Sequence, residues 1–150
     1  MNFSTSSVTF NIHPYQEGVN PPVTKPNHTF LTSIGEEGMR DLFDRFYMRL
    51  HTSAIKDLFP QTEKEMKEAG QNSADFFIQI CGGKDYFNQN RGAPQMGRRH
   101  APFAITSEAR LHWLVLFEEA LQPLVGKVSD EDLQSFWDYI NVFSIWMINH

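Results

Sequence analysis

Apolar residues at helical spacing constrain the fold of this 150-residue chain more than any other feature. Between residues 39 and 50 they recur at i, i+3, i+4, i+7, i+8 and i+11, as Met39, Leu42, Phe43, Phe46, Tyr47 and Leu50. This spacing places side chains on one face of an α-helix. Similar stripes follow in residues 107–124 and 130–147, and no segment shows the alternation of a half-buried strand. The sequence therefore predicts an all-α fold.

Capping signals divide the chain into four main helices. Ser33-Ile34-Gly35-Glu36 and Thr62-Glu63-Lys64-Glu65 each place a hydroxyl three residues before a carboxylate, which is the capping-box pattern of a helix start. We expect these helices to end near residue 51 and near Cys81, where Gly82-Gly83 follows. The third helix starts at Ser107, and Ser129 caps the fourth. Residues 84–103 should be rich in loops with one short helix around His100, and such long links are often functional.

Residues 1–29 differ from the rest of the chain. They hold four of its eight prolines, few charges and no sustained period, which predicts an irregular extension before a single domain over residues 30–150. Within it, the side chains able to dock on the domain are Phe3, Phe10, Ile12 and Tyr15.

Charge and composition exclude several classes of function. A net charge of −5 argues against nucleic-acid binding, which needs a basic surface. The single cysteine, Cys81, cannot form an intrachain disulfide and is expected to be a buried thiol of a protein in a reducing compartment. No apolar run approaches the ~20 residues of a membrane span, and the N-terminus lacks a secretory signal pattern. We expect a cytoplasmic protein with no membrane partner.

Histidines are the most informative polar residues. The chain has six, and no two stand three or four residues apart, which argues against a metal site made by two histidines on one helix. His100 follows Arg98-Arg99 and precedes a run with Phe103 and Ile105. From spacing alone, a surface or half-buried histidine is the more ordinary interpretation. Ligation of a haem iron is the alternative, because it needs an imidazole on an apolar wall.

Short motifs in a fixed order decide between these interpretations. They are Arg45-Phe46-Tyr47, Phe59-Pro60, Phe76-Phe77, Gly82-Gly83, Gly92-x-Pro94, Arg99-His100-x-Pro102-Phe103 and Trp113. This order resembles the truncated haemoglobins, and group II most closely, over about Thr32 to Asn149. The resemblance implies a globin-like two-over-two helical sandwich around haem b.

The resemblance also implies roles for individual residues. His100 would be the metal ligand on the proximal side of the iron. Tyr47 and Trp113 would donate hydrogen bonds to a ligand on the distal side, where Ser73 and Ala69 also lie. For Tyr47, packing in the core with a backbone partner is the alternative. The remaining haem contacts would come from Phe59, Phe76, Phe77, Met96, Arg99 and Phe103, with Arg99 placed to meet a propionate.

Two departures from the family pattern affect these roles. The position that holds a tyrosine in many relatives is occupied by Phe87 here. The contact of that tyrosine with a haem propionate is therefore lost unless Tyr86 or Lys84 replaces it. Ala69 and Ser73 are both small, so these two positions of the distal helix offer no histidine or glutamine to the haem. We expect a roomy distal site to which Ser73 adds a weak donor.

The resemblance implies binding and transport of oxygen, with NO or CO as further ligands. A haem redox enzyme, either an NO dioxygenase or a peroxidase, is the first alternative, and it needs a separate reductase as a partner. A non-enzymatic sensor or interaction module, in which the extension contacts a partner, is the second. A monomer and a homodimer are both compatible with the sequence.

Overall fold

The computed structural model describes residues 6–150, and its regular elements are almost all helical. The elements in chain order are α1 (His28–His51), η1 (Lys56–Leu58), α2 (Glu63–Ile80), α3 (Tyr86–Arg91), α4 (Met96–His100), α5 (Ser107–Leu121), η2 (Gln122–Leu124) and α6 (Asp130–Met147). One isolated β-bridge joins Val125 and Val128. The predicted all-α fold with four main helices, α1, α2, α5 and α6, is confirmed.

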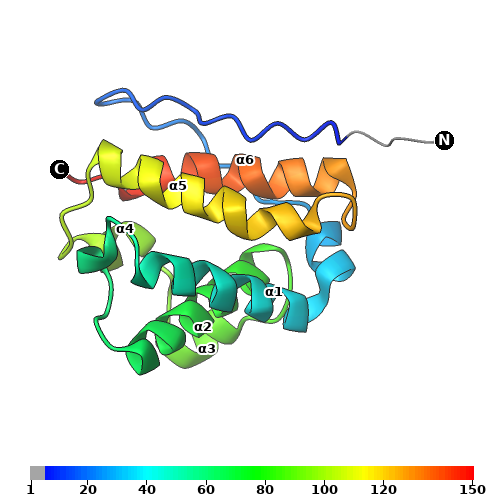
Figure 1. The fold of residues 1–150 in the computed structure, drawn as a ribbon, viewed down its shortest axis with the longest axis horizontal. Helices are drawn as coiled ribbons and strands as arrows, with labels where there is room; N and C mark the ends of the chain where they lie inside the picture. The colour runs from blue at the N-terminus through cyan, green and yellow to red at the C-terminus, as the bar shows by residue number, and fades with distance from the viewer. Residues whose placement is uncertain (1–5) are drawn as a thin grey trace.

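The four long helices form two layers. Figure 1 shows α5 and α6 side by side in one layer, with α1 and α2 in the other. The short helices α3 and α4 complete the link between α2 and α5, where the sequence predicted a single short helix. This is the two-over-two arrangement of four helices, and it leaves α4 with His100 between the layers.

The start of α1 differs from the prediction. The helix begins at His28 rather than near Ser33, and no side chain caps its first turn. Its backbone breaks at Gly35, where φ is 73° and ψ is 170°, a conformation that glycine tolerates. The early turn is held by α6 instead, because Thr29 Oγ1 donates to Asp132 Oδ1 at 2.6 Å. At Thr62 the predicted cap forms, since its hydroxyl accepts from the Glu65 N–H at 3.1 Å, while the Glu65 carboxylate accepts from that hydroxyl at 2.8 Å rather than from the Thr62 N–H.

Aromatic rings join the two layers in the core. Phe30 of α1 stacks on Phe136 of α6 with ring centroids 4.3 Å apart. Phe46 and Phe117, from α1 and α5, lie 4.2 Å apart. Aromatic pairs of this kind add about 0.5–1.5 kcal/mol each beyond the burial of their area. The high phenylalanine content therefore serves mainly to pack the helices around the space that remains between them.

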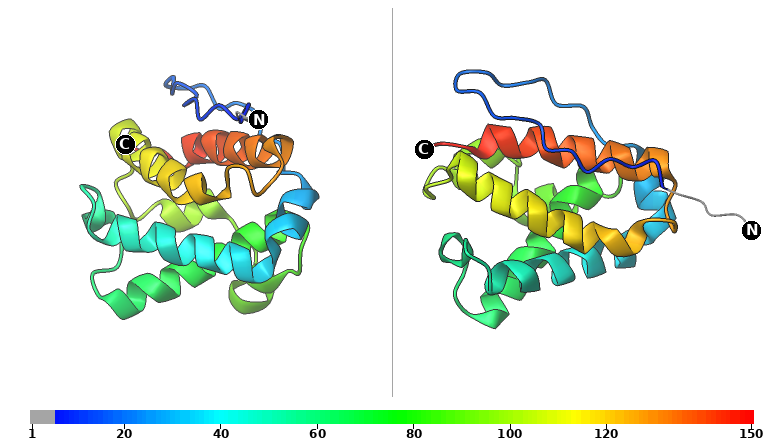
Figure 2. Two further views of the ribbon diagram at one scale, coloured as in Figure 1. Left: turned by 45° about the vertical axis from the view of Figure 1, so that its right-hand side comes forward. Right: turned by 45° about the horizontal axis from the view of Figure 1, so that its top comes forward.

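Residues 6–26 form an N-terminal strap without regular secondary structure, which runs along the outer face of the α5–α6 layer (Figure 2). Its backbone bonds to side chains of α6: the Thr9 N–H donates to Gln134 at 2.8 Å, and the Asn11 carbonyl accepts from Trp137 Nε1 at 2.8 Å. Phe10 meets the Trp137 ring edge to face at 5.2 Å. Phe3 lies outside the described residues.

Within residues 6–150, no helix is both long enough and apolar enough to cross a bilayer.

Candidate functional site

A cavity of about 330 Å³ lies between the layers, and every site residue predicted from the sequence lines it. Those residues are Tyr47, Phe59, Ala69, Ser73, Phe76, Phe77, Met96, Arg99, His100, Phe103 and Trp113. They come from α1, the turn after η1, α2, α4, the loop after α4, and α5. Phe103 is 45% exposed, so it lies at the edge of the cavity.

His100 is oriented by its own short helix. The Gln95 residue before α4 has a left-handed backbone, with φ at 42°, and this turns the chain into the helix. His100 Nδ1 lies 2.7 Å from the Met96 carbonyl oxygen. A carbonyl can only accept, so Nδ1 carries a proton, and in the neutral ring, which is the form that binds a metal, Nε2 has the free lone pair. Within residues 6–150, Nε2 has no hydrogen-bond partner, and it is free to bind a metal.

The C-terminal residues hold the backbone after His100. The Asn149 side chain donates to the His100 carbonyl at 3.1 Å and accepts from the Ile105 N–H at 2.9 Å. The Asn149 N–H in turn donates to the Ile105 carbonyl at 3.0 Å. These bonds fix both ends of the loop between α4 and α5, and with it the position of the histidine.

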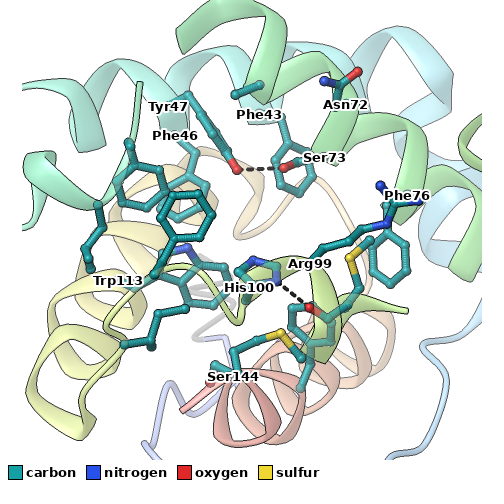
Figure 3. A pocket seen from close by; sticks show the side chains of 18 of the residues that line it. Phe43, Phe46, Tyr47, Asn72, Ser73, Phe76, Arg99, His100, Trp113 and Ser144 are labelled. Atoms are coloured by element: carbon teal, nitrogen blue, oxygen red, sulfur yellow. Dashed lines mark hydrogen bonds between the residues drawn. The ribbon is translucent and has the colours of Figure 1, made fainter. Parts of the chain in front are cut away.

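Tyr47 and Ser73 face each other on the opposite side of the cavity, across from His100 (Figure 3). Their hydroxyl oxygens lie 2.6 Å apart. Burial raises the pKa of the Tyr47 phenol, against the lowering effect of the Ser73 hydrogen bond. Gly70 permits this approach of α1 and α2, because a Cβ there would lie 3.2 Å from Tyr47 Cγ. Because its pKa is raised, the Tyr47 phenol is neutral near neutral pH and can donate a hydrogen bond.

Trp113 of α5 forms a further part of the cavity wall. Its ring packs edge to face on Phe46 at 5.4 Å and on Phe117 at 5.0 Å. The residue is half-buried and lines the cavity. Its indole N–H has no hydrogen-bond partner within residues 6–150 and is available as a donor. A ligand in the cavity would provide that partner.

Arg99 uses most of its hydrogen-bond donors to bind carbonyl groups of the loop that precedes α4. Its Nε donates to the Pro94 carbonyl at 2.6 Å, and Nη2 donates to the carbonyls of Arg91 and Ala93 at 2.7 and 2.9 Å. The guanidinium also lies 5.0 Å over the Phe87 ring. Only Nη1 remains without a partner within residues 6–150. Arg99 therefore clasps the loop, and at most this one nitrogen is available for a propionate.

The missing tyrosine of the family pattern has no replacement at the cavity. Phe87 lines it, whereas Tyr86 and Lys84 do not. The Tyr86 hydroxyl donates instead to the Glu36 carboxylate, at 3.0 and 3.1 Å. A propionate contact from Tyr86 or Lys84 is thus not supported by this structure.

Four polar residues at the cavity were not found by sequence reasoning: Asn72, Arg91, Arg110 and Ser144. Asn72 adjoins Ser73 on α2, and helical spacing could have placed it there. Arg110 and Ser144 stand on α5 and α6, and their meeting depends on how these helices pack. No local pattern in the sequence signals that contact.

The residues present fit a haem. The lining consists mostly of aromatic and aliphatic side chains, as a flat macrocycle requires, with one free imidazole nitrogen as a metal donor. Among residues 6–150, no group of three or more His, Cys, Asp or Glu side chains could hold a bare metal ion. A single protein nitrogen therefore suits a metal whose remaining ligands belong to a cofactor, such as the iron of haem.

Comparison with known proteins agrees with this geometry. The model of the bacterial-like globin family matches residues 29–149, which is most of the chain. The chain belongs to this family. Members of this globin family bind haem, usually as haem b, so the predicted cofactor is confirmed at the level of the family.

Individual relatives also support the group II resemblance. The group 2 truncated haemoglobin YjbI of Bacillus subtilis is 32% identical over 90 residues, which cover 59% of this chain and 66% of the relative. The crystal structure of phosphate-bound Hell's gate globin IV has a TM-score of 0.83 at 33% identity, covering 92% of this chain and 85% of that one. The truncated oxygen-avid haemoglobin from Bacillus subtilis has a TM-score of 0.71 at 27% identity, covering 80% and 98%.

The matched region spans 58 to 66% of the length of the curated relatives. The predicted membership of the truncated haemoglobins and the predicted two-over-two fold are confirmed.

Proposed function

We propose that this globin holds haem b in the cavity through His100 and binds oxygen and other small ligands there. The observation that carries the proposal is the free Nε2 of His100, which faces Tyr47 and Ser73 across an apolar cavity. When bound, haem supplies an iron with an open coordination position for a diatomic ligand. The description of a Bacillus subtilis relative as oxygen-avid supports oxygen as the ligand.

The protein's own contribution is to hold and hydrogen-bond that ligand. Tyr47 O–H and Trp113 N–H are donors in a cavity lined mainly by apolar side chains, where a hydrogen bond is stronger than in water. A polarised acceptor gains about 1.5–3 kcal/mol from each donor of this kind. Ser73 lies within hydrogen-bond distance of the Tyr47 hydroxyl, and it holds that hydroxyl in the cavity. Retention of oxygen follows from these donors.

The remaining site roles belong to this proposal as well. Phe59, Phe76, Phe77 and Met96 would pack against the macrocycle, and Phe103 would cover its edge. Ala69 leaves room beside Ser73 on the distal side. Arg99 acts by fixing the loop before His100, with one nitrogen left for a propionate.

A haem redox enzyme is a second candidate function, either an NO dioxygenase or a peroxidase. The polar pair Tyr47 and Ser73 and the arginines at the cavity favour it. In an NO dioxygenase or a peroxidase, an electron donor such as a separate reductase is required after each turnover. NO and CO are further ligands, and both a monomer and a homodimer are compatible with the proposal. A sensor role through the strap ranks behind these. The cytoplasmic location stays a prediction.

Absorption spectroscopy of the purified protein tests the primary proposal. The protein is loaded with haemin, reduced with dithionite and exposed to CO. We expect a Soret band that sharpens and shifts on CO addition. A spectrum that equals free haemin, or that does not respond to CO, would contradict the proposal. The enzymatic alternative requires NO consumption faster than that of free haemin under the same conditions.

A further inference from the structure

Arg110 is a buried cation in the wall of the cavity. It is 3% exposed, on α5, and lines the cavity together with Ser144 of α6. Its Nε donates to Ser144 Oγ at 2.8 Å, and Nη2 donates to the Asn141 carbonyl and Oδ1 at 2.8 and 3.0 Å. All three acceptors are neutral, and within residues 6–150 no carboxylate lies within 4.0 Å of this guanidinium.

Such an arrangement is unusual, because a buried charge normally has a partner of opposite charge. Burial lowers the pKa of Arg110 to about 10. The guanidinium therefore stays protonated at neutral pH. The wall carries a full positive charge with which no carboxylate of residues 6–150 forms an ion pair.

The other groups at the cavity do not compensate it either. Among residues 6–150, the ionisable residues that line the cavity besides Tyr47 and Arg110 are Arg91, Arg99 and His100, and no aspartate or glutamate does so. In a chain with a net charge of −5, this one cavity is lined only by neutral and basic side chains. The low polarity of the wall strengthens the field of Arg110 inside it. Arg110 therefore makes the addition of negative charge within the cavity more favourable than it would be beside a neutral side chain.

The strap fixes the side chain of Asn141, which accepts a hydrogen bond from Arg110. The His13 N–H donates to Asn141 Oδ1 at 2.7 Å, and Asn141 Nδ2 donates to the Asn11 carbonyl at 2.6 Å. Asn141 thus joins the strap on the outside of α6 to Arg110 on the inside. The amide is oriented on both sides, so the guanidinium has little freedom to leave the wall.

We propose that Arg110 sets the electrostatics of the haem site, stabilising ferrous over ferric iron and strengthening the binding of anionic ligands to the ferric form. This inference rests on the proposed function, since it requires haem in the cavity. Reduction adds one electron to the site and azide adds one negative charge, whereas CO adds none. Arg110 therefore affects the first two equilibria and leaves the third unchanged.

The test compares haem-loaded wild type with Arg110→Met and Arg110→Lys. Potentiometric titration measures the ferric/ferrous equilibrium, and optical titrations measure azide and CO affinity. In Arg110→Met we expect the equilibrium to shift about tenfold toward ferric iron, which is about 59 mV for one electron. Azide should bind about tenfold more weakly, and CO within twofold of wild type. Arg110→Lys keeps the charge and should recover most of both changes.

A second variant covers the case in which Arg110→Met does not fold. Asn141→Asp puts a carboxylate beside the intact guanidinium, and we expect it to shift both equilibria at least threefold in the same direction. Gln134→Glu adds the same charge on α6 beneath the strap, away from the cavity lining, and should shift neither. Unchanged potential and azide affinity in a haem-loaded Asn141→Asp variant would overturn the inference alone. Failure of the wild type to bind haem would overturn the proposed function and this inference together.

Discussion

The Tyr47 and Ser73 hydroxyl oxygens lie 2.6 Å apart, and this hydrogen bond joins α1 to α2 across the cavity from His100. A phenol has one proton to donate. When it donates that proton to a ligand in the cavity, the Ser73 hydroxyl can donate to the phenol oxygen instead. Hydrogen bonds in such a chain strengthen each other. The pair is therefore a stronger donor than an isolated tyrosine.

Removal of the phenol should release oxygen faster. In Tyr47→Phe, the loss of a hydrogen bond worth ~1.5–3 kcal/mol should raise the oxygen dissociation rate about 10- to 100-fold. Ser73→Ala should raise it severalfold, because Tyr47 keeps its proton but loses support. Stopped-flow mixing with an excess of CO measures these rates. Slower release from Ser73→Ala would show that Tyr47 donates to Ser73 rather than to the ligand.

Trp113 should act as the second donor. Trp113→Phe keeps an aromatic ring against Phe46 and Phe117 but removes the N–H, so oxygen should dissociate about tenfold faster. Trp146→Phe is the matched control, since Trp146 is 46% exposed and its indole binds the Pro21 carbonyl of the strap. Equal dissociation rates in wild type and Trp113→Phe would exclude a bond from this indole to the ligand.

Arg99 should matter for the stability of the loop before His100. Arg99→Lys cannot make its bonds to the carbonyls of Pro94, Arg91 and Ala93 together, and we expect a loss of about 1–3 kcal/mol in the free energy of unfolding. Haem transfer to an excess of apomyoglobin should also become faster. Arg98→Lys, at an exposed neighbouring position, should change neither quantity. Similar unfolding midpoints in urea for both variants would contradict the loop-clasping role.

Cys81 should make the fold sensitive to alkali. Burial raises the pKa of its thiol from 9.0 to about 12. Between these values the unfolded chain has lost the proton and the folded chain has kept it. This contribution to stability is thus complete below pH 9 and falls by about 1.4 kcal/mol per pH unit above it.

Urea unfolding at pH 7 to 11 measures this effect against Cys81→Ala. The stability advantage of wild type over the variant should be constant up to pH 9 and should shrink above it. Tyr139, whose pKa is raised by burial and further by the charge of Cys81, keeps the effect of its burial in both proteins and loses only the part that comes from Cys81 in the variant. Parallel pH profiles for the two proteins would contradict the account of Cys81.

The helices that the sequence predicts well are those with a complete local signal. Thr62 supplies the cap of α2, and the stripe from Met39 to Leu50 supplies the buried face of α1. The first turn of α1 has no such signal, because Asp132 and Ser135 of α6 hold it through Thr29 and Asn27. These partners are more than a hundred residues away. Tertiary contacts, rather than local propensity, determine where this helix begins.

The cavity shows the same division. His100, Tyr47 and Trp113 belong to ordered motifs, so the sequence proposes them as site residues, and the structure brings them to one cavity. Arg110 looks in the sequence like any charged residue of a helix. Its burial depends on Asn141 and Ser144 of α6, which lie beside it only after α5 and α6 pack together. Sequence periodicity could not reveal a cation whose partners are supplied by another helix.

The central claim is that His100 Nε2 binds a haem iron, and spectra of the His100→Gly variant test it most directly. The haemin-loaded variant is compared with wild type, before and after addition of imidazole, which can occupy the space of the missing ring. We predict an intense Soret band in wild type, a weak and shifted band in His100→Gly, and its recovery with imidazole. A Soret band and CO complex that are the same with and without His100 would contradict the account.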